Sequence, residues 1–431
     1  MDFILTSLLS IMLSGFGPSA LGSGFLNYSQ GASAAAMGGA YIAYANDPTA
    51  VFYNPAGIAF LDGTQVSLGT SMVTFRSTLG LPNWPDSKYR SVHNEEKWDY
   101  HSSFYISHRF GNRVSFGFGY FSPYGASIEW PEDYPLRYAS ISDSSKTYVF
   151  NPVIAVKLNE RVSAAIGLSY IDSKVSREQA LLFDFTETGA ASSSFVAQSS
   201  YEVDGKVWGL NAGALYREKD FSLGLNWRGG YQIEYEGNLN VQSSDVRIPP
   251  PLNPNLILPE SSSISFSYNY PHIFGAGAWF NLAEKLTAAI DVHYVLWSAL
   301  DQGSIDFDDP FFTDFSVEYD WRDSFQFMGG MEYRLSEKLV LRTGISYFQT
   351  PQPAEDVHPG LPDGDSWVFS GGLGYKAGKF VLDLAYQFAS LRERKSPNRN
   401  LLIDHSTGVN LGEGTYSSNG HYLGINLGYL F

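Results

Sequence analysis

The chain has 431 residues, a formal net charge of −16 and no cysteine, and aromatic residues make up 16% of it. The acidic balance argues against nucleic acid as a partner, because proteins that bind nucleic acids present basic patches. The length would allow two or three soluble domains, yet glycine and aromatic residues recur along the whole chain without a change in composition that would mark a linker.

The first long apolar run covers residues 3–13 and is too short for a transmembrane helix. Small residues follow it, with a suitable cleavage position between Gly22 and Ser23, so residues 1–22 are expected to form a signal peptide. Signal peptides usually begin with basic residues, whereas this one carries Asp2 and no basic residue. The position of the natural start therefore stays open. Without a second apolar run of this kind, we expect the mature chain to be either soluble or a β-barrel.

Residues 32–60 are small, apolar and almost free of charge, and two Asx-proline pairs occur among them: Asp47-Pro48 and Asn54-Pro55. Each pair predicts a helix start, since the side chain before proline can cap the first amides and proline suits the first turn. Two short apolar helical turns are not stable alone in water. We therefore expect the rest of the chain to enclose the segment, either as a soluble core or as a container around it.

From Thr64 onward, apolar and polar residues alternate with a period of two. Between residues 380 and 388, for example, Phe380, Leu384 and Phe388 share one face, opposite Asp383. Such alternation predicts strands with unlike faces. We expect fourteen strands, at residues 64–77, 100–110, 113–123, 145–158, 161–175, 200–217, 221–236, 264–281, 286–300, 319–334, 338–349, 366–376, 379–391 and 417–431.

The connections between these strands alternate between tight turns and long loops. A soluble sandwich would also show the period of two, but this alternation of connections is typical of a bacterial outer-membrane barrel. The last strand places apolar residues at every odd position from Leu423 to the terminal Phe431. This ending resembles the C-terminal signal read by the barrel-assembly machinery, which we therefore expect as a partner during biogenesis.

Several motifs resemble the FadL/TodX family of outer-membrane transporters for long-chain fatty acids and other hydrophobic molecules. They are the run from Met37 to Ala40, Asp47-Pro48, and Asn54-Pro55-Ala56-Gly57 near the N-terminus, and residues 321–324, 330–333 and 341–344 later on. The resemblance covers essentially the whole mature chain. It implies an all-β fold, a fourteen-stranded antiparallel transmembrane β-barrel at residues 63–431, plugged by a small, partly helical hatch at residues 23–62.

The resemblance also implies roles for hatch residues. Asn54, Pro55 and Ala56 match the motif that gates the hatch, although Asn54 could equally cap a helix and anchor the plug. A binding pocket is expected between the hatch and the barrel wall. The candidate pocket residues on the hatch are Tyr41, Tyr44, Val51, Phe52 and Tyr53.

Two long loops carry more aliphatic surface than solvated loops usually do, and exposed apolar patches often mark binding. In the family the corresponding loops form the first capture groove; the alternative is that they pack on each other as a lid. The first stretch, residues 180–185, also has helical potential. The candidate capture residues are Leu181, Leu182, Phe183, Phe185, Leu252, Leu256, Ile257 and Leu258.

A fatty acid would also need a cation for its carboxylate and an exit that avoids water. Arg342 lies on the polar face of its strand and is the candidate cation, ahead of Arg76 and Arg137. We favour the alternative that Arg342 forms a salt bridge with an inward acid, Asp383 or Asp291.

For the exit, the third predicted strand has glycines that weaken pairing and a proline that removes a donor. Its position matches the kinked strand that opens the barrel sideways in the family, so Phe121, Pro123 and Gly125 are the candidate residues of a lateral opening. The alternative is that Pro123 simply ends the strand.

No catalytic motif fits the predicted strands, so we expect a transporter without enzymatic activity or cofactor. The acidic group Asp306, Asp308, Asp309 and Asp314 is interpreted as a solvated loop in preference to a calcium site. The predicted protein is a monomeric channel in the outer membrane of a Gram-negative bacterium, in contact with lipid and lipopolysaccharide. Its predicted cargo is a long-chain fatty acid or, second, a monoaromatic hydrocarbon; a hydrophilic porin or an adhesin-like barrel is the alternative of another class.

Overall fold

A computed structural model of the protein describes residues 24–184, 194–242, 259–300, 302–312, 314–398, 403–404 and 409–431. The expected signal peptide, residues 1–22, lies outside the described residues. Among the described residues, no helix is long and apolar enough to cross a membrane.

Twenty strand segments form one closed antiparallel sheet. Segments separated by a short break, such as β4 and β5, belong to one wall strand, so the wall has 14 strands and the predicted fold class is confirmed. The segments are β1 (Thr64–Gly80), β2 (Ser91–His93), β3 (Trp98–Phe110), β4 (Val114–Phe121), β5 (Gly125–Glu129), β6 (Ser142–Lys157), β7 (Val162–Asp184), β8 (Ser194–Arg217), β9 (Phe221–Arg228), β10 (Tyr231–Gln242), β11 (Ser261–Tyr270), β12 (Ile273–Ala283), β13 (Leu286–Val295), β14 (Gln302–Phe307), β15 (Phe315–Glu318), β16 (Ser324–Arg334), β17 (Leu339–Phe348), β18 (Ser366–Ala377), β19 (Phe380–Ser396) and β22 (Gly414–Leu430).

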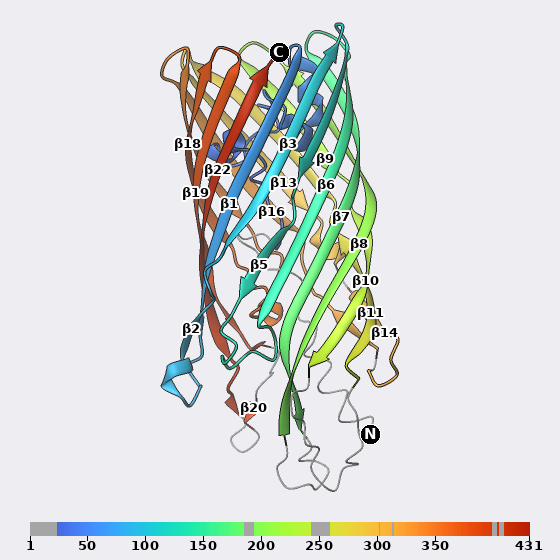
Figure 1. The fold of residues 1–431 in the computed structure, drawn as a ribbon. Coiled ribbons are helices and arrows are strands. Elements are labelled where there is room, and N and C mark those ends of the chain that lie inside the picture. Colours follow the sequence, from blue (N-terminus) through green and yellow to red (C-terminus); the bar gives the residue numbers. More distant parts are fainter. Residues whose placement is uncertain are drawn as a thin grey trace.

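The barrel closes between its first and last strands. β22 pairs with β1 along its length, from Gln65 opposite Leu430 to Gly80 opposite Thr415. Short turns join neighbouring strands at one end, where the C-terminus also lies, and the longer connections lie at the other end (Figure 1). In outer-membrane barrels the short turns face the periplasm, which assigns the short-turn end to that side. Outside the wall, β20 (Ile403–Asp404) pairs with β21 (Val409–Asn410).

The two faces of the wall differ in the way that the period of two predicts. Ile290 is 58% exposed whereas the next residue, Asp291, is 2% exposed, and Leu427 is 48% exposed beside Asn426 at 6%. The apolar side chains form the outer surface and the polar ones point inward. Since closure pairs the wall's backbone groups between strands, this apolar exterior can face lipid.

Several predicted strand ends differ from the structure, and the largest difference is at β7, which pairs with β8. β7 and β8 continue beyond the predicted limits of residues 175 and 200, and Leu181 pairs with Ala197 in the extension. The stretch expected to be a loop with helical potential is therefore strand as far as Asp184. The two extensions pair with each other, so each strand is stabilised by a partner that lies elsewhere in the sequence. Local propensity does not reveal such a partner.

Two predicted strands are interrupted. The strand expected at residues 221–236 breaks at Gly229 and Gly230, between β9 and β10, and the one expected at 264–281 breaks at Pro271 and His272, between β11 and β12. Glycine weakens a strand and proline removes a ladder donor. The neighbouring strands are paired on both sides of each break, so the wall continues past it.

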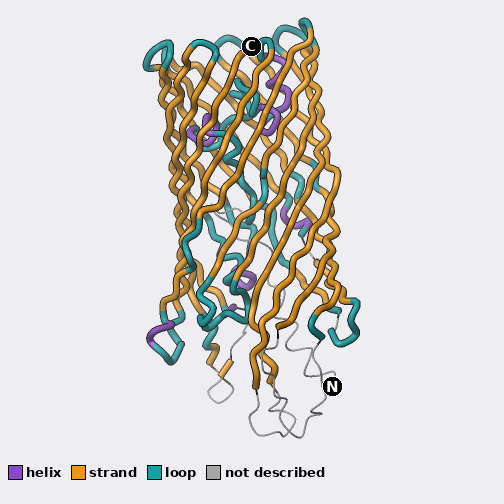
Figure 2. The backbone as a smooth tube through the Cα atoms, in the orientation of Figure 1, coloured by secondary structure: helices purple, strands orange, loops and turns teal. Residues whose placement is uncertain are grey.

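The N-terminal segment, residues 24–62, lies inside the barrel toward the short-turn end, and we call this segment the hatch (Figure 2). It contains the helices α2 (Ala32–Ala36) and α3 (Ala50–Tyr53) and the 3-10 helix η1 (Pro55–Phe60). Pro55 occupies the first turn of η1, as the Asn54-Pro55 pair predicts, whereas α3 begins at Ala50, beyond Pro48. Further short helices lie in the connections, at Ser87–Tyr89 (η2), Trp297–Ala299 (η4) and Ala354–Asp356 (η5).

Candidate transport site

Polar side chains of the wall bond to the backbone of the hatch. The Asp291 carboxylate on β13 accepts hydrogen bonds from Tyr41 N at 2.6 Å and from Ile42 N at 2.8 Å. Ser346 Oγ on β17 donates to Gly38 O at 2.6 Å. Helices this short leave most of their backbone groups unpaired, so the wall supplies the partners that hold the hatch in place.

Inward glycines let the hatch backbone approach the wall closely. A Cβ placed at Gly213 would lie 2.2 Å from Asn54 Oδ1, and one placed at Gly344 would lie 2.3 Å from Gly38 N. At Gly224, a Cβ would lie 2.7 Å from Ile42 O. No larger residue fits at these positions without displacing either the hatch or the strand.

Asn54 both caps a helix and ties the hatch to the wall. Its Oδ1 accepts a hydrogen bond from Ala56 N at 3.2 Å, and its Nδ2 donates to Ile42 O at 3.0 Å and to Ala214 O of β8 at 3.1 Å. The side chain is fully buried, and Pro55 follows it in the first turn of η1. The geometry is that of the anchoring alternative; a gating role for Asn54 stays a prediction.

Two of the five predicted pocket residues bond within the hatch itself. Tyr41 and Tyr53 are at most 1% exposed. The hydroxyl of Tyr41 donates to Asp47 Oδ2 at 2.5 Å, and that of Tyr53 donates to Tyr28 O at 2.5 Å. Their polar groups thus stabilise the hatch.

The other three residues reach the wall. Val51 is fully buried and packs on β4, where a Cβ at Gly117 or Gly119 would lie 2.8 or 3.0 Å from its methyl groups. The ring of Phe52 meets that of Phe121, the last residue of β4, edge to face at 5.2 Å, and Phe121 stacks on Tyr105 at 5.9 Å. Tyr44 stacks on Trp279 of β12 at 6.0 Å. Val51 and Phe52 are therefore the predicted pocket residues that lie beside the third wall strand.

Arg342 is neutralised by two carboxylates. Its guanidinium lies 2.8 Å from Glu332 Oε2 and 2.5 Å from Asp383 Oδ1, and the three side chains are 9%, 8% and 13% exposed, respectively. The salt-bridge alternative with Asp383 is what the structure has, while Asp291 binds the hatch instead. Arg342 is thus not the unpaired cation that a ligand carboxylate would require.

The two further candidate cations are also engaged. Arg76 pairs with Glu96 at 3.0 Å and both side chains are about half exposed. Arg137 donates to Tyr138 Oη at 2.8 Å and stacks on the same ring.

Arg228 is a cation that the sequence analysis missed. It is the last residue of β9, partly buried, and its Nη2 donates to Phe52 O at 3.2 Å. Its guanidinium lies 4.9 Å from the ring centre of Phe52 and 5.5 Å from that of Phe121. The signal that could have found it is register: Ser222 and Asn226, which are three steps and one step of the period earlier on this strand, also bond to hatch carbonyls.

The wall strand that contains the predicted lateral opening is interrupted, not ended, at Pro123. β4 stops at Phe121 and β5 resumes at Gly125, whose φ of 135° is open to glycine but strained for other residues. Between them the chain pairs with the start of the hatch: Asn27 N donates to Pro123 O at 2.7 Å, and Gly125 N donates to Phe25 O at 3.3 Å.

The break removes a partner from the neighbouring strand. β3 pairs with β4 over its residues 104–110, which run from the pair Phe104–Tyr120 to the short-turn end. Residues 98–103 of β3 lie beyond this pairing and pair with β1, on the opposite edge of the strand. Farther along, the Asp99 carboxylate accepts a hydrogen bond from Ser127 N of β5 at 3.2 Å. The wall is thus interrupted between β3 and the junction of β4 with β5, beside Phe121 and the hatch.

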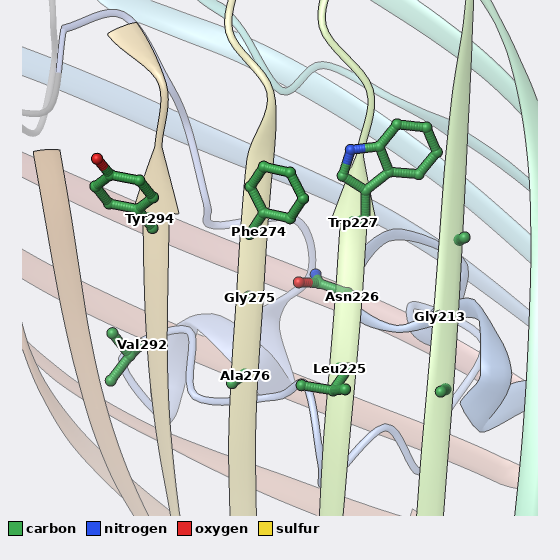
Figure 3. A pocket seen from close by; sticks show the side chains of 11 residues that line it. Gly213, Leu225, Asn226, Trp227, Phe274, Gly275, Ala276, Val292 and Tyr294 are labelled. Carbon is green, nitrogen blue, oxygen red and sulfur yellow. The ribbon is translucent and has the colours of Figure 1, made fainter. Parts of the chain in front are cut away.

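A hollow of about 560 Å³ lies on the outer face of β8, β9, β12 and β13 (Figure 3). Leu225 and Phe274, which line it, are 61% and 46% exposed. The hatch lies behind these strands, where Asn226 Nδ2 donates to Tyr53 O at 2.6 Å. This hollow therefore belongs to the lipid-facing surface and is distinct from the internal pocket that the sequence predicts.

The predicted capture residues are only partly described. Leu181 is 5% exposed on β7, and Leu182 and Phe183 belong to the same strand. Phe185, Leu252, Leu256, Ile257 and Leu258 lie outside the described residues.

The acidic stretch after β14 has local roles. Asp309 Oδ1 accepts a hydrogen bond from Phe311 N, and Asp314 Oδ1 accepts one from Phe307 N, each at 2.8 Å. Across the part of the chain that the structure describes, no group of three or more acidic or histidine side chains is arranged to hold a metal ion.

A buried carboxyl holds the beginning of the hatch. Asp363 Oδ2, in the connection between β17 and β18, accepts hydrogen bonds from Gly24 N at 2.9 Å and from Thr350 Oγ1 at 2.5 Å. Asp363 is 1% exposed, and this burial raises its pKa to about 6.

Comparisons with known proteins agree over most of the chain. The profile of a family described as "Outer membrane protein transport protein (OMPP1/FadL/TodX)" matches residues 14–431. The long-chain fatty acid transport protein of Salmonella typhi is 23% identical over 371 residues, which are 80% of this chain and 83% of that protein.

Two solved structures have the same architecture. A Pseudomonas aeruginosa FadL homologue matches with a TM-score of 0.80 and 18% identity, over 94% of this chain and 99% of that one. The toluene transporter TodX of Pseudomonas putida matches with a TM-score of 0.72 and 17% identity, over 93% and 98%. At these identities the two structures show the fold.

Proposed function

Because the chain belongs to the outer membrane protein transport protein family (OMPP1/FadL/TodX) and is an outer-membrane β-barrel, we propose that it imports long-chain fatty acids by passive diffusion. The observation that supports this most directly is the interruption of a wall strand at residues 122–124, beside the hatch. A plugged barrel with a break in its side suits a cargo that dissolves in lipid, since leaving sideways avoids the cost of exposing apolar surface to water.

The proposed route has three stages. Apolar residues around 181–185 and 252–258 capture the cargo outside the lipopolysaccharide layer. The cargo then enters the barrel and meets the hatch near Phe52. It leaves past Phe121, Pro123 and Gly125, between β3 and the β4–β5 junction, into the membrane lipid.

In this proposal the hatch is a gate that responds to cargo. Asn54 holds it through hydrogen bonds to Ile42 O and Ala214 O, at 3.0 and 3.1 Å. A ligand shifts the hatch only if it binds the displaced form more tightly than the closed form. Contacts of the cargo with Phe52, which shares the hatch with Asn54, would supply that difference.

Monoaromatic hydrocarbons are the second candidate cargo. The observation that favours them is the cluster of rings at the wall break, where Phe52, Phe121 and Tyr105 lie within 5.9 Å of their neighbours. The similarity to TodX, a toluene transporter, agrees with this candidate.

The test is uptake of labelled oleate by cells that lack their own fatty-acid transporter and express this chain. We expect uptake above the empty vector, and its loss in Asn54→Ala while the folded barrel, seen as a heat-modifiable band, is retained. Asn83→Ala is the matched control, because Asn83 is an exposed asparagine in the connection between β1 and β2 and donates to Asn410 O.

Other outcomes separate the remaining functions. Uptake of toluene without uptake of oleate would select the second candidate, whereas equal passage of small sugars would indicate a porin. An adhesin-like barrel would keep its surface binding after residues 24–62 are deleted. We propose that the transporter works as a monomer, so cross-linking in intact cells should leave it at the size of one chain.

A further inference from the structure

A second apolar hollow, of about 490 Å³, lies on the outer face of β18, β19, β22, β1 and β3. Tyr100, Tyr386 and Leu423 line it and are 69%, 46% and 39% exposed. Gly371 also lines it, and a Cβ there would lie 3.9 Å from its nearest neighbour, so the surface is open at this position. We call this site the second hollow, to distinguish it from the hollow of Figure 3.

The second hollow runs across the strands and reaches the wall break. Leu423 of β22 lies opposite Tyr386 of β19 on one side and opposite Met72 of β1 on the other. Met72 lies in turn opposite Tyr100 of β3. Tyr100 belongs to residues 98–103, the part of β3 that lies beyond the pairing with β4. The second hollow therefore borders the wall break on the outside of the barrel.

Aromatic rings cover the outer face on the opposite border of the break. Tyr120 of β4 stacks on Tyr148 of β6 at 6.1 Å and meets Phe150 at 5.2 Å. A chain that leaves the barrel through the break thus meets a ridge of rings toward β6 and an open hollow toward β1. The shape of the outer surface favours the direction toward β1.

The second hollow is long enough for one hydrocarbon chain. From β18 to β3 it crosses four strand spacings of about 4.8 Å, or about 19 Å. An acyl chain covers about 15 Å, half of a hydrocarbon core about 30 Å thick. Lipid chains compete for the hollow, because they are as apolar as its lining and leave no hydrophobic driving force within the membrane. A chain still held in the break has the advantage of a high effective concentration beside the hollow.

We propose that the second hollow receives the hydrocarbon tail of a cargo molecule that is leaving through the wall break, and guides it into the membrane lipid along β1 and β22. The inference rests on the proposed function and deepens it, because it adds a binding site on the outer face for an amphiphile with one long chain. Toluene is too short to occupy the hollow while it is still held in the break. The second hollow therefore acts on long-chain cargo.

The hollow of Figure 3 provides the comparison for a test in cells. It also faces lipid, but β8, β9, β12 and β13, which form it, do not border the break. Cells that lack their own fatty-acid transporter and express the full chain receive a fatty acid with a photoreactive diazirine in mid-chain. After a flash of light, mass spectrometry identifies the labelled residues. We expect Met72, Tyr100 and Leu423 to be labelled at least about 5-fold more than Leu225 and Phe274, because only the first hollow on the cargo's path holds a tethered chain.

A phospholipid that carries the same diazirine is the control ligand. In vesicles that contain the purified full-length barrel, it should label the two hollows to a similar extent, because it reaches both from the surrounding lipid. Stronger labelling of the second hollow by this phospholipid as well would make it a general lipid site and would overturn the proposal.

Filling each hollow gives a matched pair of variants. Thr70→Trp places a ring in the second hollow beside the break, and Ala276→Trp places one in the hollow of Figure 3; both positions are exposed. We expect Thr70→Trp to slow oleate uptake about 2- to 5-fold, the size of several lost van der Waals contacts, and to leave toluene uptake unchanged. Ala276→Trp should change neither, and the heat-modifiable band shows that each barrel folds.

The remaining outcomes separate this proposal from the function on which it rests. Equal labelling of both hollows by the fatty acid, or unchanged oleate uptake in Thr70→Trp, would overturn the second hollow as a cargo site while the transport of fatty acids stands. If the wild type takes up neither oleate nor toluene, the proposed function falls, and this inference falls with it.

Discussion

Two arginines reach the hatch region from different strands, and their surroundings are opposite in kind. Arg342 on β17 is held by Glu332 and Asp383, whereas Arg228 on β9 faces a backbone carbonyl and aromatic rings. An inward cation alone is therefore a poor indicator of a ligand site. The two differ in their acidic partners: Arg342 has two carboxylates and belongs to the framework, whereas Arg228 has none within ion-pair distance among the described residues.

The sharpest contrast is expected in stability. Arg342→Met leaves Glu332 and Asp383, 8% and 13% exposed, without their cation, and this should cost about 3–5 kcal/mol of unfolding free energy. Arg228→Met leaves no carboxylate behind among the described residues and loses the hydrogen bond to Phe52 O, so its cost should be about 0.5–1.5 kcal/mol. Urea unfolding of both variants in lipid vesicles, read from the heat-modifiable band, measures the difference. Equal destabilisation would contradict the distinction between the two arginines.

A smaller effect is expected where the hatch meets a wall glycine. Gly213→Ala places a Cβ 2.2 Å from Asn54 Oδ1, and relieving such a clash costs about 1–3 kcal/mol. Gly371→Ala is the control, because the nearest atom to its Cβ would be Arg342 O at 3.9 Å. We expect Gly213→Ala, but not Gly371→Ala, to raise the frequency of conducting openings in planar bilayers. Silent bilayers with both variants would show that the hatch tolerates the extra methyl group.

The smallest effect concerns a buried acid. Burial raises the pKa of Asp363 to about 6 from the ordinary value of 3.8, so the docked form binds a proton more readily than the undocked form. Docking of the hatch start should therefore weaken as the pH rises from about 4 to about 6 and stay constant above that range.

This pH dependence can be read from a spin label, because the chain has no cysteine of its own. A nitroxide on Asn27→Cys should become more mobile between pH 4 and 6. The same label combined with Asp363→Asn should show no such change. A pH response that persists in Asp363→Asn would place its source elsewhere.

The wall was predictable because its pattern is local. A lipid-facing strand needs an apolar residue at every second position, so the period of two and the tight turns lead directly to 14 strands. The Asn54-Pro55 pair likewise marks the start of η1, because both residues act on the backbone next to them.

The parts that sequence reasoning missed depend on residues far apart in the chain. The extension of β7 beyond residue 175 requires β8 as a partner, and apolar residues near 181 look the same in a loop as in a strand. Arg342 and Arg228 are both inward arginines in the sequence. Only the fold shows that the first meets two carboxylates while the second meets Phe52 and Phe121.

The most direct test of the account is a crystal structure of the full chain with a brominated fatty acid, whose bromine atoms locate the chain by anomalous scattering. We predict the bromines between the hatch and the wall break, beside Phe52 and Phe121. Bromines found only in the outer hollow of Figure 3 would contradict it.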